Sequence, residues 1–304
     1  MASRISGFKM CACGLLPLFF ILTGCVNLGG KSASSPAADN PAAAGSAPAL
    51  KNTIIYLAGS GSCEASLKLI KAPFEKAHPG VTLNFLPSTS SGDGIKGAGE
   101  GLLDVGLTAR TMKTEEKIKY PGLRERMFLK DAVVLAVNKN VGIKNITTGQ
   151  IVKIFNGEIT NWKKLGGPDG KIVLLDREES ESSKMLLRKN FLGSDLQVTK
   201  SAILINSAET MNRAIEDTKN TIGQTSIASV LIGGYKNIVP LAIDNIAPTP
   251  QNVANGSYKL VREYGLVISL PAEKNGVNDL ADYVYEDEAI NIFSKYDSVP
   301  VGKK

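Results

Sequence analysis

The stretch LLDREESESSK, residues 174–184, is the part of the chain from which the fold and the function are best inferred. The apolar run 172–175 is typical of a buried strand, and the apolar spacing within 185–192 predicts a helix. A hydroxyl-rich turn with Arg177 at its edge thus opens a helix N-terminus, where backbone N–H groups, hydroxyls and a guanidinium favour an oxyanion. The same pattern also fits a serine that caps an ordinary helix, with Arg177 in solvent.

The composition is that of an ordinary globular protein. The chain has 304 residues, of which 43% are hydrophobic and 21% charged, enough for one large or two medium domains. Its net charge is +6, but the basic residues are interspersed and aromatic residues make up only 6%. This pattern disfavours nucleic acid as a partner and is compatible with a small anion.

The N-terminus predicts a lipid anchor. Arg4 and Lys9 precede an apolar run, residues 15–22, that is too short to span a bilayer comfortably. The sequence LTGC, residues 22–25, follows and resembles a bacterial lipobox, in which Cys25 becomes the lipid-modified first residue. We expect residues 1–24 to be a signal peptide, and Cys25 to hold the protein at the periplasmic side of a bacterial membrane. A plain secretory signal or an interfacial helix are the alternatives.

Residues 25–52 are rich in Ala, Ser, Pro and Gly and predict a flexible tether. With Cys11 and Cys13 removed and Cys25 lipidated, Cys63 is the one cysteine left, so no intrachain disulfide is expected. We expect Cys63 to act as a small buried hydrophobe.

The remaining chain alternates strands, small-residue turns and helices, which predicts an α/β fold with a parallel sheet and covering helices. Strands are expected at 53–57, 81–86 and 103–107, and they end near Ser60 and Ser62, Ser91, and Thr108. Ligands in such sheets bind beyond the carboxyl ends of the strands. Hydroxyls at several strand ends therefore favour anion binding over purely structural turns.

Two long apolar runs, 131–138 and 258–269, are expected to be extended crossovers between two lobes. A single C-terminal helix is expected to pack on the first lobe. Other expected elements are helices at 147–155 and 210–215, strands at 202–205 and 238–243, and the C-terminal helix at 280–293.

Three segments carry a family resemblance: DAVVLAVN (131–138), IVKIFNGEITNWKKLGGPDGKIVLLDREES (151–180) and IDNIAPT (243–249). Together they resemble the phosphate ABC transporter substrate-binding protein family, as a divergent branch. The resemblance implies a two-lobed periplasmic binding protein of type II-like fold, with two extended crossover strands forming a hinge. Lobe 1 would comprise 53–132 and 257–304, and lobe 2 would comprise 133–256.

The implied function is that of a lipid-anchored, monomeric binding protein that captures an oxyanion, first of all inorganic phosphate, for the permease of an ABC transporter. No cofactor or metal is implied. The implied ligand-binding residues are Ser60, Gly61 and Ser62 in the first turn, Ser91 and Gly92 in the second, Thr108 at the third strand end, and Arg177, Glu181, Ser182 and Ser183 in the second lobe.

Two departures from the family pattern concern the ligand. Glu181 stands where a ligand-facing serine is expected, and Ala109 and Arg110 occupy the region of an aspartate that accepts the proton of phosphate. Three interpretations stay open. Glu181 points away or is held by Arg110 or Lys184; it replaces the missing aspartate; or the ligand is not phosphate.

The sequence leaves two other classes of function to consider. A phosphatase-like serine hydrolase needs a base, but the sequence has one histidine, His78, expected to be a solvated helix cap, and Gly59-Ser60-Gly61 lacks the G-x-S-x-G spacing. A catalytic zinc site lacks ligands, and no P-loop motif is present. The other class is a lipoprotein of the same fold that binds another anion or a protein partner.

Overall fold

The computed structural model describes residues 52–269, 274 and 276–303. The predicted signal peptide, Cys25 and all but the last residue of the predicted tether lie outside these residues. Within the described part, no helix combines the length and the apolar character needed to cross a membrane.

A ten-stranded sheet runs through the described chain. Its continuous path, in spatial order, is β2 (Val81–Phe85), β1 (Thr53–Gly59), β3 (Val105–Thr108), β11 (Val261–Ser269), β4 (Leu123–Asn138), β8 (Thr221–Ser226), β6 (Val173–Asp176) and β7 (Ile203–Leu204). Two further strands, β9 (Ile238–Pro240) and β12 (Val299–Pro300), pair with β4. A separate two-stranded sheet joins β10 (Ala242–Ile243) to β5 (Asn145–Ile146).

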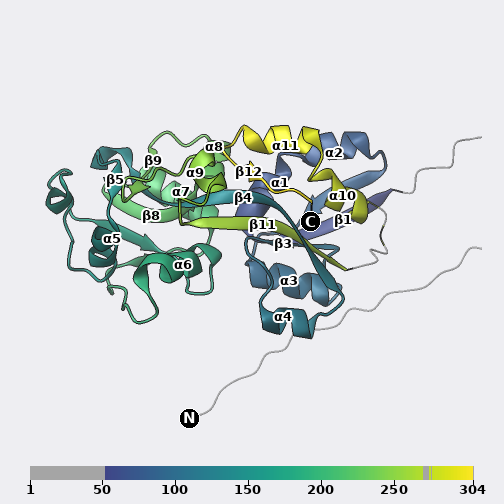
Figure 1. Ribbon diagram of the computed structural model, residues 1–304, viewed down its shortest axis with the longest axis horizontal. Helices are drawn as coiled ribbons and strands as arrows, with labels where there is room; N and C mark the ends of the chain where they lie inside the picture. The colour runs from purple at the N-terminus through teal and green to yellow at the C-terminus, as the bar shows by residue number, and fades with distance from the viewer. Residues whose placement is uncertain (1–51, 270–273, 275, 304) are drawn as a thin grey trace, which may run out of the picture. The chain divides into compact units, whose positions relative to one another are not determined.

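The large sheet consists of two parallel halves joined by an antiparallel centre. Strands β2, β1 and β3 are parallel, as are β8, β6 and β7. Between them β11 and β4 pair antiparallel along their length, and Figure 1 shows these two strands side by side. The strand order therefore changes direction on both sides of the β11–β4 pair, and such switch points are where α/β sheets bind ligands.

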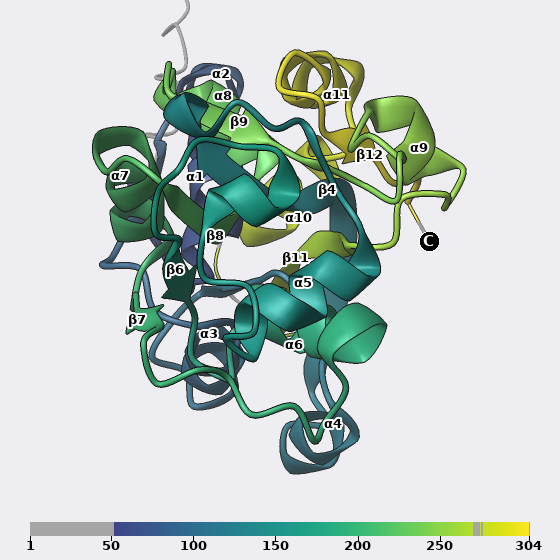
Figure 2. The same ribbon diagram turned by 90° about the vertical axis from the view of Figure 1, so that its left-hand side faces the viewer.

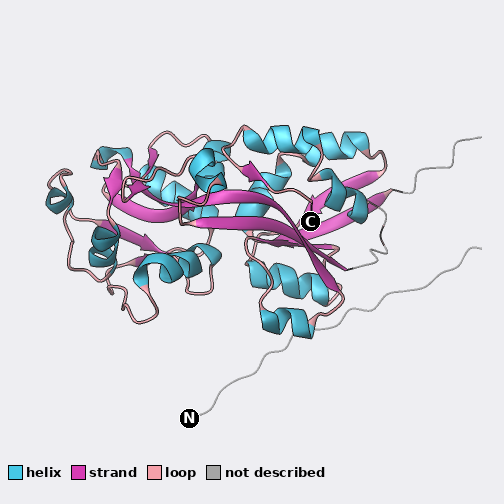
Figure 3. Cartoon of the chain, in the orientation of Figure 1, coloured by secondary structure: helices cyan, strands magenta, loops and turns pink. Residues whose placement is uncertain are grey.

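Helices flank both halves of the sheet, as the cyan and magenta segments of Figure 3 show. Helices α5, α6 and α7 lie around β6 and β8 (Figure 2). The helices are α1 (Gly61–Lys68), α2 (Lys71–Ala77), α3 (Ser91–Gly99), α4 (Thr114–Lys119), α5 (Thr148–Phe155), α6 (Ser182–Leu187), α7 (Ala208–Asp217), α8 (Ile227–Gly233), α9 (Pro250–Ala254), α10 (Val277–Tyr283) and α11 (Asp287–Ser294). Short 3-10 turns η1 (Lys139–Val141) and η2 (Trp162–Leu165) and a π-helical turn η3 (Arg188–Leu192) complete the set.

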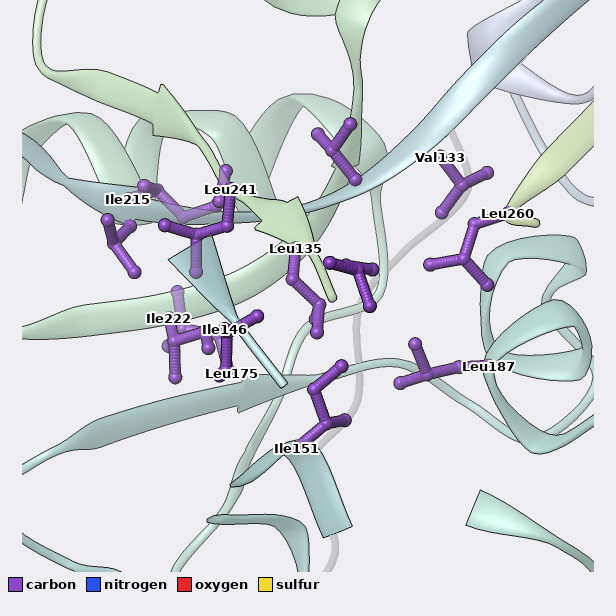
Figure 4. Packing of buried hydrophobic residues seen from close by; sticks show 14 of the residues in the cluster. Val133, Leu135, Ile146, Ile151, Leu175, Leu187, Ile215, Ile222, Leu241 and Leu260 are labelled. Atoms are coloured by element: carbon purple, nitrogen blue, oxygen red, sulfur yellow. The ribbon is translucent and has the colours of Figure 1, made fainter. Parts of the chain in front are cut away.

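Apolar side chains form two main clusters, one on each half of the sheet. The first is built on Leu135, Leu175 and Ile222 and includes Ile151 of α5 and Leu187 of α6, which point toward one another in Figure 4. The second gathers β1, β3, β11 and the C-terminal helices, and a smaller third cluster lies under α3. Each fully buried aliphatic side chain contributes about 1.5–3 kcal/mol. The lobe boundaries drawn from the sequence stay a prediction.

The structure differs from the expected elements in several places: the strand expected at 238–243 divides into β9 and β10, and the helix expected within 185–192 is α6 followed by η3. Strand β4 begins at Leu123 rather than at 131, because polar residues such as Arg124 and Arg126 pair with β11 and hide the strand in the apolar pattern. Strand β8 was not expected at all, because TIGQTS reads as polar although all six residues are buried. The expected helix 280–293 is wrong: it breaks between α10 and α11, where Tyr285 and Glu286 make i−3 backbone bonds.

Two singled-out residues are packed rather than reactive. Cys63 is fully buried, and burial raises the pKa of its thiol to about 12, so the expected small buried hydrophobe is what the structure shows. His78 is the C-cap of α2, as expected, but it is half-buried rather than fully solvated: its ring stacks on Phe74 at 4.3 Å between centroids, and Nδ1 lies 3.0 Å from the Phe74 carbonyl oxygen.

Candidate functional site

A small polar cavity lies at the switch points of the large sheet. Its volume is about 30 Å³, and because a single buried water needs about 10–15 Å³, the cavity suits a ligand of a few heavy atoms. The lining residues come from the ends of β1, β6 and β8 and from β11, and they are Ser60, Gly61, Ser62, Arg177, Glu181, Ser182, Ser183, Ala208, Gln224, Thr225, Ser226, Ser229 and Arg262.

The turn after β1 presents hydroxyls and backbone N–H groups to this cavity. Gly59 has φ 135°, and a Cβ there would lie 2.2 Å from the Leu107 carbonyl oxygen, so only glycine allows this close approach to β3. Ser60 precedes α1 and its N–H donates to that same carbonyl at 2.9 Å. The Ser60 and Ser62 hydroxyls bond no described neighbour, and the first N–H groups of α1 have no partner within the helix.

Arg177 follows β6 and is the principal cation of the cavity. Its side chain is 7% exposed, and Nη2 lies 3.0 Å from Glu181 Oε2. Its Nε atom is buried without a hydrogen-bond partner in the structure. A buried guanidinium N–H left unpaired is costly, so Arg177 Nε is an uncommitted donor beside this cavity.

Gln224 of β8 presents an acceptor to the cavity. Its Nε2 donates to Asp176 Oδ1 at 2.9 Å, and Asp176 is itself paired with Lys184, whose Nζ lies 2.5 Å from Oδ2. Because a carboxylate only accepts hydrogen bonds when ionised, Asp176 fixes which end of the amide turns away from the cavity. The remaining Oε1 of Gln224 is buried and has no donor in the structure.

The end of β8 and the start of α8 complete one wall. Ser226 caps α8, since its hydroxyl accepts the Ser229 N–H at 3.1 Å and also bonds the Ser229 hydroxyl. The Thr225 hydroxyl donates to Asn212 Oδ1. These hydroxyls are committed within the protein, so the free ones belong to Ser60, Ser62 and Ser183.

A second buried cation, Arg262, lies on the central strand β11 opposite Asp131 of β4. Its Nε and Nη2 donate to Asp131 Oδ2 at 3.3 Å, and Nη2 also donates to the Tyr264 hydroxyl at 2.9 Å. The Tyr264 hydroxyl donates in turn to Asp131 Oδ2, and burial raises the pKa of Tyr264 well above its usual value. Nη1 makes one long contact, 3.4 Å, to the Ser182 hydroxyl.

The structure brings seven of the ten predicted binding residues to this one cavity: Ser60, Gly61, Ser62, Arg177, Glu181, Ser182 and Ser183. It does not place the other three along the lining. The Ser91 hydroxyl accepts the Ala109 N–H at 3.0 Å, the Thr108 hydroxyl donates to the Arg110 carbonyl at 2.6 Å, and Gly92 lies in the first turn of α3. Their part in ligand binding stays a prediction.

Glu181 is held by neither of the two cations that the sequence suggested. Arg110 donates two hydrogen bonds to the Glu116 carboxylate, at 2.7 and 2.8 Å. Burial alone would raise the pKa of Glu116, but the hydrogen-bonded Arg110 holds this pKa below its usual value. Lys184 is committed to Asp176 and lies 3.7 Å from Glu179. Glu181 instead pairs with Arg177 and lines the cavity, so it does not point away.

Sequence reasoning missed the residues that β8 and β11 contribute, above all Gln224 and Arg262. Strand β8 has no apolar run, so its one sequence signal is the capping pattern of Ser226 before the apolar run of α8. Arg262 and its neighbour Glu263 are the charged residues of an otherwise mostly apolar strand pattern, and this interruption in a strand was the available signal.

The arrangement can hold an anion through hydrogen bonds, but it offers no evident chemistry of its own. Two arginines, free hydroxyls and backbone N–H groups are donors, and the Glu181 carboxylate and Gln224 Oε1 are acceptors. Among the described residues no three His, Cys, Asp or Glu side chains are placed to hold a metal. The site therefore fits a binding function for an anion that both accepts and donates hydrogen bonds.

Comparisons with known proteins agree in their class. A family model described as "PBP superfamily domain" matches residues 32–288. The phosphate-binding protein PstS of Bacillus subtilis is 28% identical over 206 residues, which cover 68% of this chain and 67% of that protein. A solved structure from Clostridium perfringens, described as a phosphate ABC transporter substrate-binding protein with bound phosphate, is 27% identical with a TM-score of 0.73, covering 82% of this chain and 99% of its own.

An ABC-type phosphate transport receptor from Vibrio cholerae has the same fold, with a TM-score of 0.62, 23% identity and coverage of 81% of this chain and 99% of its own. Together with the two parallel halves joined by β4 and β11, these matches confirm the two-lobed α/β fold class expected from the sequence.

Proposed function

The chain belongs to the PBP superfamily, and within it to the phosphate ABC transporter substrate-binding proteins, and from this premise we propose that it captures inorganic phosphate in the cavity between Ser60, Arg177 and Gln224. As a member of a family of transport binding proteins, it is not an enzyme. Its task is to bind the ion and to release it to a permease.

One observation carries the choice of ligand. Four buried side-chain atoms in the described residues have no hydrogen-bond partner, and two of them, Arg177 Nε and Gln224 Oε1, belong to residues that line this one cavity. One is a donor and the other an acceptor, so the missing partner both accepts and donates hydrogen bonds. Phosphate keeps at least one proton near neutral pH and meets both requirements, whereas sulfate has no proton to donate to Gln224.

The available donors are sufficient for tight binding. Each charge-assisted hydrogen bond contributes about 1.5–3 kcal/mol. Arg177, the hydroxyls of Ser60, Ser62 and Ser183, and the N–H groups of the first turn of α1 together exceed the roughly 8 kcal/mol of micromolar binding, before the costs of ordering. We propose that the two lobes close on the ion about the β4–β11 crossover strands.

A thermal-shift series tests the function. Phosphate and arsenate should raise the melting temperature of the purified protein, and sulfate and molybdate should not. At a phosphate concentration a thousand times the dissociation constant, binding stabilises the protein by about 4 kcal/mol, which corresponds to roughly 10 °C. An equal shift with sulfate would refute the role of Gln224, and no shift with any oxyanion would refute the proposed function.

Glu181 is proposed to share with Gln224 the role of the aspartate that accepts the phosphate proton: singly charged phosphate has a proton for each of them, and doubly charged phosphate has one proton that either can accept. A carboxylate about 4 Å from a fully deprotonated anion costs about 4 kcal/mol at an effective dielectric of 20, so Glu181 is tolerable only if the ligand donates a hydrogen to it. Its presence among the lining residues and its ion pair with Arg177 support this role.

Replacing Glu181 with glutamine should lower the ratio of phosphate affinity to sulfate affinity at least tenfold, about 1.4 kcal/mol, because the repulsion of sulfate disappears. Titration of both anions by calorimetry measures the ratio. Glu179→Gln is the matched control, since Glu179 lies in the same loop but pairs with Arg188 outside the cavity. If Glu181→Gln changes neither affinity, Glu181 has no place in the site. Unchanged phosphate binding in Glu181→Ser would lead to the same conclusion.

We further propose that the protein is anchored by acylated Cys25 on the outer side of a bacterial membrane, works as a monomer and delivers phosphate to an ABC permease. The lipobox-like LTGC and the class of the similar proteins support this arrangement. Metabolic labelling with a radioactive fatty acid should mark the chain, and Cys25→Ala should abolish the label.

A further inference from the structure

Arg262 is unusual among the cavity residues because it belongs to the central strand pair and not to a strand-end turn. It is 8% exposed and lies on β11, at the rung directly opposite Asp131 of β4. These two strands join the parallel halves of the sheet, and the boundary between the two main apolar clusters falls at the same rungs.

The hydrogen bonds of Arg262 leave part of its guanidinium free. Of five N–H groups, Nε and one on Nη2 donate to Asp131, the second on Nη2 donates to Tyr264, and one on Nη1 makes the 3.4 Å contact to Ser182. The last N–H of Nη1 has no acceptor in the described part of the chain. Arg262 lines the cavity, so Nη1 is the end that a bound ion can reach.

The charges of the lining show why a second cation matters. Arg177 and Glu181 lie 3.0 Å apart and largely cancel one another. Arg262 is the other charged residue of the lining. Its partner Asp131 lies behind it, where its carboxylate is shared among Arg262, the Tyr264 hydroxyl and the Ala228 N–H.

We propose that Arg262 binds the oxyanion through Nη1 as a second countercharge, and that Asp131 and Tyr264 are positioning residues that hold it in place. This inference rests on the proposed function. In it, the positive charge of Arg262 makes the site bind doubly charged phosphate more tightly than singly charged phosphate. Because Arg262 belongs to the crossover strand, the ion is then held by both halves of the sheet and by the segment that joins them.

The test uses two variants, because an unpaired Asp131 could unfold the protein. Asp131→Asn combined with Arg262→Gln removes both charges and keeps a neutral hydrogen-bonding pair, and Arg262→Lys keeps the charge beside Asp131 but loses the planar fork. Calorimetry with inorganic phosphate is run at two pH values, below and above its second ionisation. The groups facing Arg262 are Asp131 and Tyr264, with Cys63 of α1 nearby.

The double variant should bind phosphate at least tenfold more weakly at the higher pH, with a clearly smaller loss at the lower pH. Arg262→Lys should fall between it and the wild type. The matched control is Lys130→Gln with Glu263→Gln, the cation–carboxylate pair of the adjacent rung, which lies outside the cavity and should leave affinity unchanged.

An equal loss at both pH values would assign Arg262 a structural role only, and unchanged affinity in both variants would remove it from the site. Either result overturns the inference while wild-type binding of phosphate stands. If the wild type binds neither phosphate nor arsenate, the proposed function itself fails.

Discussion

Replacing Arg177 with methionine is expected to weaken phosphate binding at least a thousandfold. The substitution removes the N–H groups of the principal cation, each worth about 1.5–3 kcal/mol in a charge-assisted bond. It also leaves Glu181 without the partner now 3.0 Å away, and an unbalanced carboxylate about 4 Å from the anion costs about 4 kcal/mol more at an effective dielectric of 20. Calorimetric titration with phosphate measures the loss.

A second substitution separates these two contributions. Arg177→Met combined with Glu181→Gln should recover part of the loss, because the repulsive carboxylate is gone while the lost donors are not replaced. Arg213→Met serves as the control, since Arg213 is an exposed arginine that pairs with Glu209 away from the cavity. A fall of less than tenfold in Arg177→Met, with the fold intact by circular dichroism, would contradict the site.

The arginine and the serines that follow β6 could be found from the sequence because their signal is local. A buried strand, a hydroxyl-rich turn and a helix occupy one short stretch, and the carboxyl ends of parallel strands meet at one edge of a sheet. The same rule predicts that the turn after β1 lies close to this stretch. In the structure, one cavity is lined by Ser60, Ser62, Arg177 and Ser183.

The contribution of β8 could not be found in this way because Gln224 and Thr225 are satisfied by partners on other elements. Thr221 donates to the Thr218 carbonyl, Gln224 donates to Asp176, and Thr225 donates to Asn212. These partners lie as far as 48 residues away in the chain. The sequence therefore shows polar residues without showing the hydrogen bonds that offset the cost of burying them.

The neighbours of Ser91 and Thr108 explain why the expected second and third turns do not reach the cavity. Both hydroxyls are used to fix the chain after β3, through the Ala109 N–H and the Arg110 carbonyl. A strand end that carries a hydroxyl predicts where a side chain lies, but not whether a backbone group nearby already binds it.

Replacing Lys184 with methionine is expected to destabilise the protein by about 3–5 kcal/mol, because it leaves the Asp176 carboxylate buried without its cation. Lys184 is fully buried, with Nζ 2.5 Å from Asp176 Oδ2 and above the Phe155 ring. The melting temperature should fall by roughly 10 °C. An exposed pair such as Arg213–Glu209 is the control, and its loss should cost less than about 1 kcal/mol.

Adding Asp176→Leu to Lys184→Met distinguishes stability from ligand binding. An apolar pair of similar volume often replaces a buried ion pair at little or no cost, so most of the melting temperature should return. Phosphate affinity should stay low, because Asp176 also holds the Gln224 amide with its oxygen toward the cavity. If affinity recovers together with stability, Asp176 does not orient Gln224, and the acceptor in the cavity is set by other contacts.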